Sequence, residues 1–398
     1  QMSRALRRAA TSGDSAETQS LRWEVRAGRD RFEADAEELQ ALFTATGAPV
    51  TSQLPWLTVW LRAFPEADPW IMVVIDAESR LRAAAPLARR PHRWGNELVL
   101  IGDGVSDYAR MPACDLLAAS TLARGLASHL SRLRSEWTLA IRQLPIEDPV
   151  ANGLAARLRH ARLLPGRAAP QTHITQRDAN VYLSRNHRGQ ARNKRNRLER
   201  DGHHPRVERL RDPGRIRAEL DEVVSVCRER EQEMLGRSPL DEPGRERFFR
   251  EMVLSHAELD VVELVLLRAG GEIAAYSLNL RDGSAYRSYN VHHAPRWAAY
   301  SPGRILNAEM VASVVGDPRF ATYDWMMGLE PYKLHAANHI EPSSELLAWS
   351  SPVVGGAAFA AQRLRGRLEA AGERDERATH ALETLRGLRA RVQRRAFS

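Results

Sequence analysis

The stretch that decides the fold is SYNVHHAPRWAAYSPGRILNAEMV, residues 288–311. Its first residues follow a β-strand pattern that ends at about His293. A helix then begins at Ser301, a residue type favoured at the N-cap, and the proline after it suits the first helical turn. Gly303 lets a ligand approach the backbone, and Arg304 adds a cation beside it. Because the free N–H groups of a helix start attract anions, this stretch predicts a pyrophosphate site, although a capped helix start alone is common.

The elements around this stretch follow an α/β order. Three strand candidates precede it, joined by the glycine-bearing turns AGGE and RDGS. A basic helix, a strand and two further helices come before them, and one final strand follows the helix at Ser301. By number, the helices are 183–200, 215–235, 244–256 and the one from 301, and the strands are 205–210, 260–270, 272–283, 284–293 and 321–327.

The first half of the chain has a similar order of elements. The pattern predicts a strand at 23–28, helices at 33–46 and 54–64, a hairpin that turns around 77–79, a helix at 116–134 and a strand at 137–144. No direct sequence repeat is visible, but two halves of like order indicate an internal duplication. We therefore expect an α/β protein with four parts: a disordered lead at 1–20, domains at 21–180 and 181–350, and a helical basic tail at 351–398.

The composition restricts the partners and the location. The net charge of +8 indicates anionic partners, for which coenzyme A, a nucleic acid and a membrane surface all qualify. The longest apolar run near the N-terminus, WIMVVI from Trp70, is far below the ~20 residues of a membrane span. Cys114 and Cys227 are far apart and belong to no Cys/His cluster, which argues against a zinc site or a disulfide framework and fits a reducing cytoplasm. Cys227 lies on the apolar stripe of its helix, which favours core packing over a nucleophilic role.

Five motifs carry a resemblance to a known family: LSRNHRGQARNKRNRLERDG, GGEIAAYSLNL, SYNVHH, YSPGRIL and YDWMMGLEPYK. They resemble the GNAT-like acetyltransferases typified by the CelD cellulose-biosynthesis (BioF-like) proteins, over Tyr182 to about Lys333. Met326 stands where the family's turn has a glycine. More distantly the chain resembles the Fem-type transferases, which take amino acids from aminoacyl-tRNA. The resemblance implies tandem GNAT-like domains with mixed, mainly antiparallel sheets flanked by helices.

The resemblance also implies the direct transfer of an acyl group from acyl-CoA, with acetyl-CoA as the first choice, to an amine acceptor. The thioester would lie between the strands that end at Val291 and Trp325, where backbone N–H groups hold its oxygen. We expect His292 as the general base, Asp324 as the second choice, and Tyr332 as the proton donor to the thiolate. The expected donor-binding residues are Val291, Ser301, Gly303, Arg304 and Ile305.

Each of these residues also has an ordinary structural explanation. His292 can simply close a strand, Asp324 can cap a turn or pair with an arginine, and Tyr332 can be a half-buried core aromatic. Glu263 lies in an apolar strand, so its carboxylate must face a cleft or a partner. The further residues expected at the substrate are Glu263, Asn290, Lys333 and Arg192, and Lys333 can equally pair with Glu330 at the surface.

The basic helix leaves a second donor open. Residues 184–211 carry ten Arg and Lys against three acids, and Arg185, Arg188, Arg192 and Arg195 share one helical face. That face predicts contact with phosphates of CoA or of a tRNA, or else a solvated helix. No nucleic-acid module motif occurs, so DNA binding is not expected. The alternatives are therefore an aminoacyl-tRNA-dependent aminoacyltransferase in natural-product or cell-envelope biosynthesis, and a non-catalytic GNAT-like binding protein. We interpret the first half, with its GDGVSD stretch, as a degenerate copy that shapes the acceptor pocket.

Overall fold

The strand candidates before the SPGRIL helix form the centre of a sheet. In the computed structural model, which describes residues 21–92, 95–353 and 355, β10 (Glu272–Asp282) pairs antiparallel with both β9 (Val262–Ala269) and β11 (Ala285–His293). Helix α9 (Pro302–Gly316) then leads to β12 (Thr322–Asp324), which pairs parallel with β11. A parallel pair requires a crossover connection, and α9 supplies it.

Two seven-stranded sheets repeat one strand order. The first sheet runs β1-β2-β3-β4-β5-β14-β6, and the second, from its other edge, runs β8-β9-β10-β11-β12-β7-β13. In each sheet the fourth and fifth strands are the parallel pair, β4–β5 and β11–β12. The next position is filled by a strand from the other half of the chain, β14 in the first sheet and β7 in the second. The predicted duplication and the mixed, mainly antiparallel sheets are therefore confirmed, and the two sheets exchange one strand each.

The remaining elements are as follows. The strands are β1 (Arg22–Ala27), β2 (Asp68–Ile75), β3 (Leu81–His92), β4 (Gly95–Leu100), β5 (Trp137–Pro145), β6 (Ala161–Pro165), β7 (Ala169–His173), β8 (Arg206–Leu210), β13 (His339–Glu341) and β14 (Ser343–Trp349). The helices are α1 (Arg29–Ala34), α2 (Ala36–Ala45), α3 (Leu54–Ala63), α4 (Leu116–Arg132), α5 (Pro149–Arg157), α6 (Arg185–Arg200), α7 (Pro213–Leu235), α8 (Arg245–Glu258) and α10 (Pro331–Leu334).

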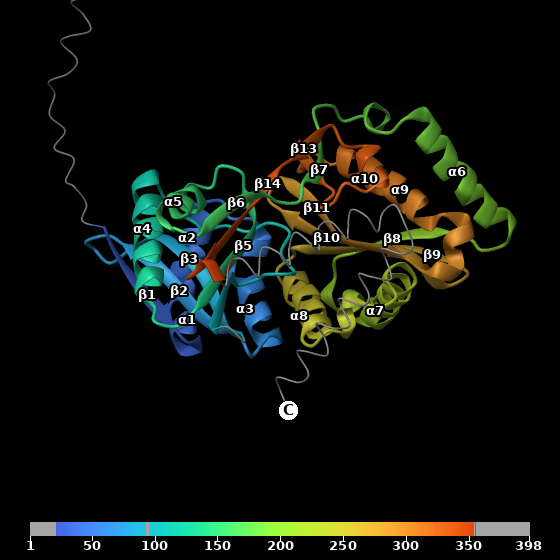
Figure 1. The fold of residues 1–398 in the computed structure, drawn as a ribbon. Coiled ribbons are helices and arrows are strands. Elements are labelled where there is room, and N and C mark those ends of the chain that lie inside the picture. The colour runs from blue at the N-terminus through green and yellow to red at the C-terminus, as the bar shows by residue number, and fades with distance from the viewer. Residues whose placement is uncertain (1–20, 93–94, 354, 356–398) are drawn as a thin grey trace, which may run out of the picture.

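The two sheets lie side by side and share a core (Figure 1). Helix α3 of the first half packs against α8 of the second, and the Trp56 and Phe248 rings meet edge to face at 5.2 Å. The ring of Tyr289 on β11 reaches the same tryptophan at 5.3 Å. Aromatic contacts of this kind add stability beyond the apolar area they bury. The junction between the halves is therefore a packed interface, and it lies next to β11.

Several expected elements differ in detail. The helix expected at 33–46 is two helices, α1 and α2, that break at Asp35, whose carboxylate pairs with Arg26 and Arg31. The strand expected at 321–327 ends at Asp324 and is not the last one, because β13 and β14 follow it. Strands β4, β6, β7, β13 and β14 and helices α5 and α10 were not predicted.

The domain boundaries at residues 180 and 350 stay a prediction, since each sheet takes one strand from the other half. The predicted lead at 1–20 lies outside the described residues, as does almost all of the predicted tail at 351–398. Among the described residues, no helix has the length and apolarity that crossing a membrane requires.

Candidate active site

Strands β11 and β12 separate just beyond their short parallel ladder. The last ladder pair is Arg287 with Asp324, and β11 continues to His293 without β12 beside it. The chain after β12 follows β7 instead, since the Trp325 N–H donates to the Pro170 carbonyl at 3.0 Å. A β-bulge also lies at Tyr289, because Leu278 pairs with Asn290 and Asn279 with Ser288. We call the region between β11 beyond Arg287 and the chain from Trp325 the V. Bulges redirect backbone groups, so the β11 side of the V has a different main-chain orientation from that of a regular strand.

Helix α9 begins beside this V without a side-chain cap. Ser301 occupies the N-cap position, but it has φ +50° and its side chain caps no helical N–H, unlike the capping role expected for it. Gly303 stands in open space, since a Cβ there would have His293 Nδ1 as its nearest neighbour at 3.9 Å. Ile305 is buried, so only its backbone can face a ligand. No side chain therefore caps the start of α9. Pro302 has no N–H, and the Arg304 N–H donates to the Ser301 carbonyl at 3.0 Å, so the Gly303 backbone is the part of the helix start best suited to an anion.

The corresponding helix of the first half is built differently. Helix α4 follows the fourth strand of its sheet as α9 does, but Asp115 caps it by accepting from the Ala118 N–H at 2.7 Å. The same carboxylate binds Arg82 at 2.9 Å. An anionic side chain on the helix start repels a phosphate from that position. The two corresponding helix starts therefore differ, because a carboxylate caps α4 and no side chain caps α9.

The turn after β12 is held by Asp324. Its carboxylate accepts from the Met326 N–H at 2.8 Å and forms an ion pair with Arg287. Asp324 is fully buried, and Arg287 is also bound to Asp282 at 2.8 Å. Met326 adopts φ +59°, the left-handed backbone for which the family's glycine is suited. Both ordinary explanations of Asp324 thus hold, since it caps the turn and pairs with an arginine.

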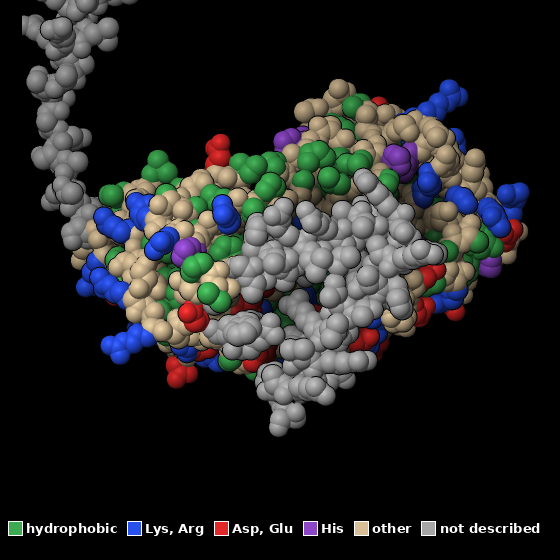
Figure 2. Space-filling view, in the orientation of Figure 1, with side chains coloured by type: hydrophobic (Ala, Val, Ile, Leu, Met, Phe, Trp, Pro, Cys, Tyr) green, Lys and Arg blue, Asp and Glu red, His purple; other side chains and the backbone are tan. Residues whose placement is uncertain are grey.

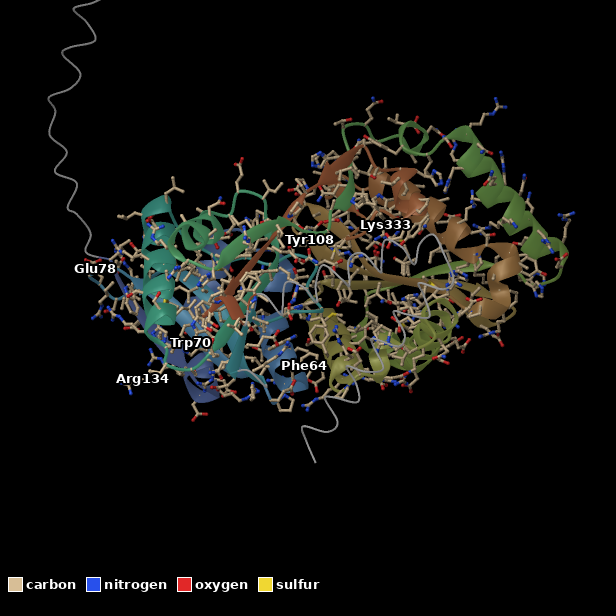
Figure 3. All side chains as sticks on the ribbon, in the orientation of Figure 1. Phe64, Trp70, Glu78, Tyr108, Arg134 and Lys333 are labelled. Atoms are coloured by element: carbon tan, nitrogen blue, oxygen red, sulfur yellow. The ribbon has the colours of Figure 1, made fainter. Side chains whose placement is uncertain are left out.

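A loop of the first half, residues 102–108, lies against the V. The Val105 carbonyl accepts from the Tyr289 hydroxyl at 2.9 Å, and the Tyr108 ring stacks under the Arg287 guanidinium at 4.6 Å. Figure 3 shows Tyr108 at the junction of the two halves. Asp107 reaches the turn after β12, because its Oδ2 accepts from the Met327 N–H at 3.2 Å. This loop therefore touches both strands of the V.

Asp107 has the most informative carboxyl group of this region. Burial raises its pKa to about 6, and the Met327 N–H together with nearby Arg167 and Lys333 offsets only part of that effect. The residue is nevertheless partly open to solvent. A carboxylate with a pKa near neutrality is suited to general-base chemistry. Sequence reasoning missed Asp107, which lies at the end of GDGVSD; the polar run directly after a buried strand was the available signal.

Lys333 and Tyr332 lie in the short helix α10. The Lys333 ammonium is buried, donates to the Met327 carbonyl at 2.6 Å and pairs with Glu330 at 2.9 Å (Figure 3). Lys333 therefore fixes the turn that also contacts Asp107. Tyr332 is 40% exposed, and partial burial raises its pKa to about 12, so its hydroxyl keeps its proton at neutral pH.

His292 and Asn290 lie on the other side of the bulge, among polar groups of α7. Asn290 accepts a hydrogen bond from the Tyr276 hydroxyl, and its amide nitrogen lies 3.4 Å from His292 Nε2. Burial lowers the pKa of His292 to about 4, so the imidazole is neutral at pH 7. Cys227, fully buried on α7 as predicted, has its pKa raised to about 12 by burial and is a thiol in this environment.

Glu263 is engaged inside the protein. Arg209 binds its carboxylate with two nitrogens, at 3.2 and 2.6 Å, and the Tyr286 hydroxyl donates to it at 2.5 Å. The carboxylate thus faces a partner, which was one of its two expected environments. These bonds occupy both carboxylate oxygens, so Glu263 holds β9 to β8 and β11 and is not assigned to the substrate.

The basic helix α6 crosses the start of α9. Lys194 donates to the Ala299 carbonyl at 3.2 Å, Arg195 pairs with Glu309 at 2.7 Å, and Gln190 accepts from Arg304. Arg192 points to solvent. Figure 2 shows Lys and Arg side chains along the end of the molecule where α6 lies. The helix therefore adds positive charge beside the phosphate-type helix start.

Comparison with known proteins agrees with this geometry. Residues 185–334 match the family model described as acetyltransferase (GNAT) domain, which confirms the predicted GNAT relationship. No curated protein sequence matched the chain. FemX has a similar structure, with 11% identity, 80% of this chain and 97% of that chain covered, and a TM-score of 0.55.

Two further solved structures share the fold. The first is the C-terminal domain of a putative lysylphosphatidylglycerol synthetase from Agrobacterium fabrum, with 11% identity, 83% of this chain and 96% of that chain covered, and a TM-score of 0.52. The second is a conserved protein of unknown function from Bacteroides thetaiotaomicron, with 14% identity, coverages of 79% and 97%, and a TM-score of 0.51. At such low identity the likeness shows the fold.

Proposed function

We propose that this acyltransferase, whose residues 185–334 form a GNAT domain, transfers an acyl group from acyl-CoA to an amine by direct attack in a ternary complex. The observation that carries the proposal is the uncapped start of α9 beside the V of β11 and β12. A pyrophosphate on the α9 N–H groups would direct the pantetheine arm along the V. Ser301, Gly303 and Ile305 would contribute backbone contacts, and Arg304 a cation.

The thioester would lie beyond the last ladder pair, Arg287 with Asp324. There the N–H groups of the bulge and of Val291 would hold the carbonyl oxygen, which gains negative charge as the amine attacks. Preorganised N–H groups stabilise that charge without reorganising during the reaction. Tyr332 is positioned on α10, after the turn, and remains our candidate for returning a proton to the thiolate of CoA.

We propose Asp107 as the general base in place of His292 and Asp324. Asp324 is fully buried in its ion pair, and a His292 pKa of about 4 makes that imidazole a weak base. The carboxylate of Asp107 attracts the ammonium form of the acceptor and has a pKa close to working pH. Residues of the first half would then complete the site, which assigns that half to the acceptor.

A donor-binding measurement tests the proposal. Acetyl-CoA and longer acyl-CoAs should raise the melting temperature of the full chain, because a ligand that binds only the folded state stabilises it, whereas adenosine alone should not. Arg304→Ala should weaken the effect. If no acyl-CoA changes the melting temperature and Arg304→Ala has no consequence, CoA is not the donor.

The alternative donor is an aminoacyl-tRNA, and the observation that favours it is α6. Its exposed residues include Arg185, Arg192, Arg197 and Arg200, more cations than one pyrophosphate requires. RNA that copurifies with the protein and is needed for activity would select this donor. We keep a small-molecule amine as the acceptor. The two free cysteines fit a reducing cytoplasm as the proposed location.

A further inference from the structure

Three metal-binding side chains meet between α7 and β11. Cys227 and Glu231 lie one helical turn apart on α7, and His292 projects from β11 towards them. The sulfur, a carboxylate oxygen and a ring nitrogen all lie within 4.8 Å of one another. No sequence motif indicates this group, because His292 is far from the other two residues along the chain.

The composition of this cluster selects a class of ion. A thiol, an imidazole and a carboxylate are the three ligand types of zinc, whereas magnesium and calcium prefer oxygen alone. Ligands placed about 2.0–2.3 Å from a tetrahedral ion lie roughly 3.3–3.8 Å from one another. The observed spacing therefore needs each side chain to move inward by less than about 1 Å, a shift within reach of side-chain rotation.

Charge balance also favours an ion here. A thiolate and a carboxylate together carry two negative charges, which a divalent cation neutralises, so the occupied site is neutral overall. Cys227 is fully buried, and burial of a net charge is costly, so a neutral complex is the form that this environment tolerates.

Neighbouring side chains already orient the ligands. The buried Ser238 hydroxyl donates to the Glu231 carboxylate. Asn290 lies against the His292 ring and is itself fixed by the Tyr276 hydroxyl. Such outer contacts commonly accompany metal ligands and hold them in place.

We propose that Cys227, Glu231 and His292 bind a zinc-class divalent cation that ties α7 to β11. Three protein ligands leave a fourth tetrahedral position for water or a small ligand. The site lies beyond the bulge of β11, away from Asp107. His292 is then a ligand, in agreement with the assignment of the base to Asp107.

Cobalt(II) titration of the untagged, chelator-treated full chain tests the proposal. A thiolate bound to cobalt gives a charge-transfer band in the near ultraviolet, and a tetrahedral site gives intense visible bands. We expect about one equivalent of cobalt per chain, displaced by zinc, as a three-ligand site requires. Cys227→Ala should abolish the charge-transfer band, while Glu231→Gln and His292→Gln should each weaken binding at least about tenfold.

Cys114→Ser is the matched control, since Cys114 is exposed and outside the cluster. Circular dichroism of each metal-free variant reports whether it folds. If Cys227→Ala does not fold, the test depends on Glu231→Gln, a substitution at a partly exposed position that should weaken cobalt binding. The proposal is overturned if the wild-type chain shows no charge-transfer band, or if the band survives in Cys227→Ala or disappears in Cys114→Ser. The cobalt spectrum is measured without an acyl donor or an amine acceptor, so its result does not depend on whether the proposed acyl transfer is correct.

Discussion

Replacing Asp107 with asparagine isolates the charge of the proposed base. The amide oxygen can still accept from the Met327 N–H, so the loop keeps its contact with the turn after β12. What the variant loses is the ability to take a proton from the amine. General bases contribute about 10²–10⁴-fold, and we expect kcat/KM at pH 7 to fall by that factor.

The pH dependence follows from the burial of Asp107. With a pKa of about 6, the carboxylate is about 90% ionised at pH 7 and about 10% at pH 5, so its contribution to kcat/KM drops about tenfold over that range. A carboxylate with an ordinary pKa would lose less than about a tenth of its ionised form over the same range. The acceptor amine also titrates, and the difference between wild type and Asp107→Asn removes that contribution.

At pH 7, Asp107→Asn should be more stable than the wild-type chain although its activity is lower. The pKa of Asp107 is higher in the folded chain than the ordinary unfolded value of about 3.9, so the folded state binds the proton more tightly. Its contribution is therefore most favourable below pH 4 and is lost as pH rises through about 6, by up to about 3 kcal/mol. Asp107→Asn has no charge to bury and should unfold at a higher denaturant concentration at pH 7.

The assay is a steady-state pH profile with acetyl-CoA and an amine acceptor, combined with urea unfolding at pH 5 and 7. Asp103→Asn is the control, since Asp103 lies in the same loop but pairs with Arg142 at 2.8 Å. The assignment of Asp107 as the base is refuted if Asp107→Asn keeps the wild-type rate and acidic limb. It is also refuted if the variant is inactive and less stable, because the role of Asp107 would then be structural.

Three further outcomes are expected. A methyl group fits at both Gly303 and Gly316 in the folded chain, so neither substitution should disturb the fold. Gly303→Ala should raise the KM for acyl-CoA at least about tenfold, because its methyl group fills the space that the ligand needs at the helix start, while Gly316→Ala at the other end of α9 should leave the KM unchanged. Arg287→Met should destabilise the chain by about 3–5 kcal/mol in urea unfolding, because the buried Asp324 carboxylate is left without its cation. Nuclease treatment should leave the acetyl-CoA-dependent rate unchanged, and a loss of activity would support an aminoacyl-tRNA donor.

Local chemistry made much of the fold predictable. The SPGRIL helix begins where its serine and proline indicated, and the glycine-bearing turns join the three central strands. The buried stripe of α7 placed Cys227 in the core. Asp324 was expected to cap a turn or to pair with an arginine, and it does both. Each of these inferences depends on residues close in sequence or on burial alone.

What escaped prediction depends on distant contacts. Ser301 is of the capping type, yet its backbone takes φ +50° and its side chain does not cap. Nothing near Glu263 in sequence indicates that Arg209 and Tyr286 would occupy it. Asp107 acquires its raised pKa only when the loop of the first half meets the turn of the second. Strand β14 belongs to the second half along the chain, but its partners β5 and β6 belong to the first.

The exchange of strands explains why one site needs both halves. Strand β7 of the first half pairs with β12 and also accepts the Trp325 N–H, so the chain after β12 follows β7 and not β11. The loop that carries Asp107 comes from the same half and contacts both β11 and the turn after β12. If the second half were expressed without the first, β12 would lose β7, and its exposed backbone groups would have only β11 left to pair with. In the proposed function the two halves have diverged in role: Asp115 caps the helix start of the first half, while a strand and a loop of that half contact the proposed site of the second.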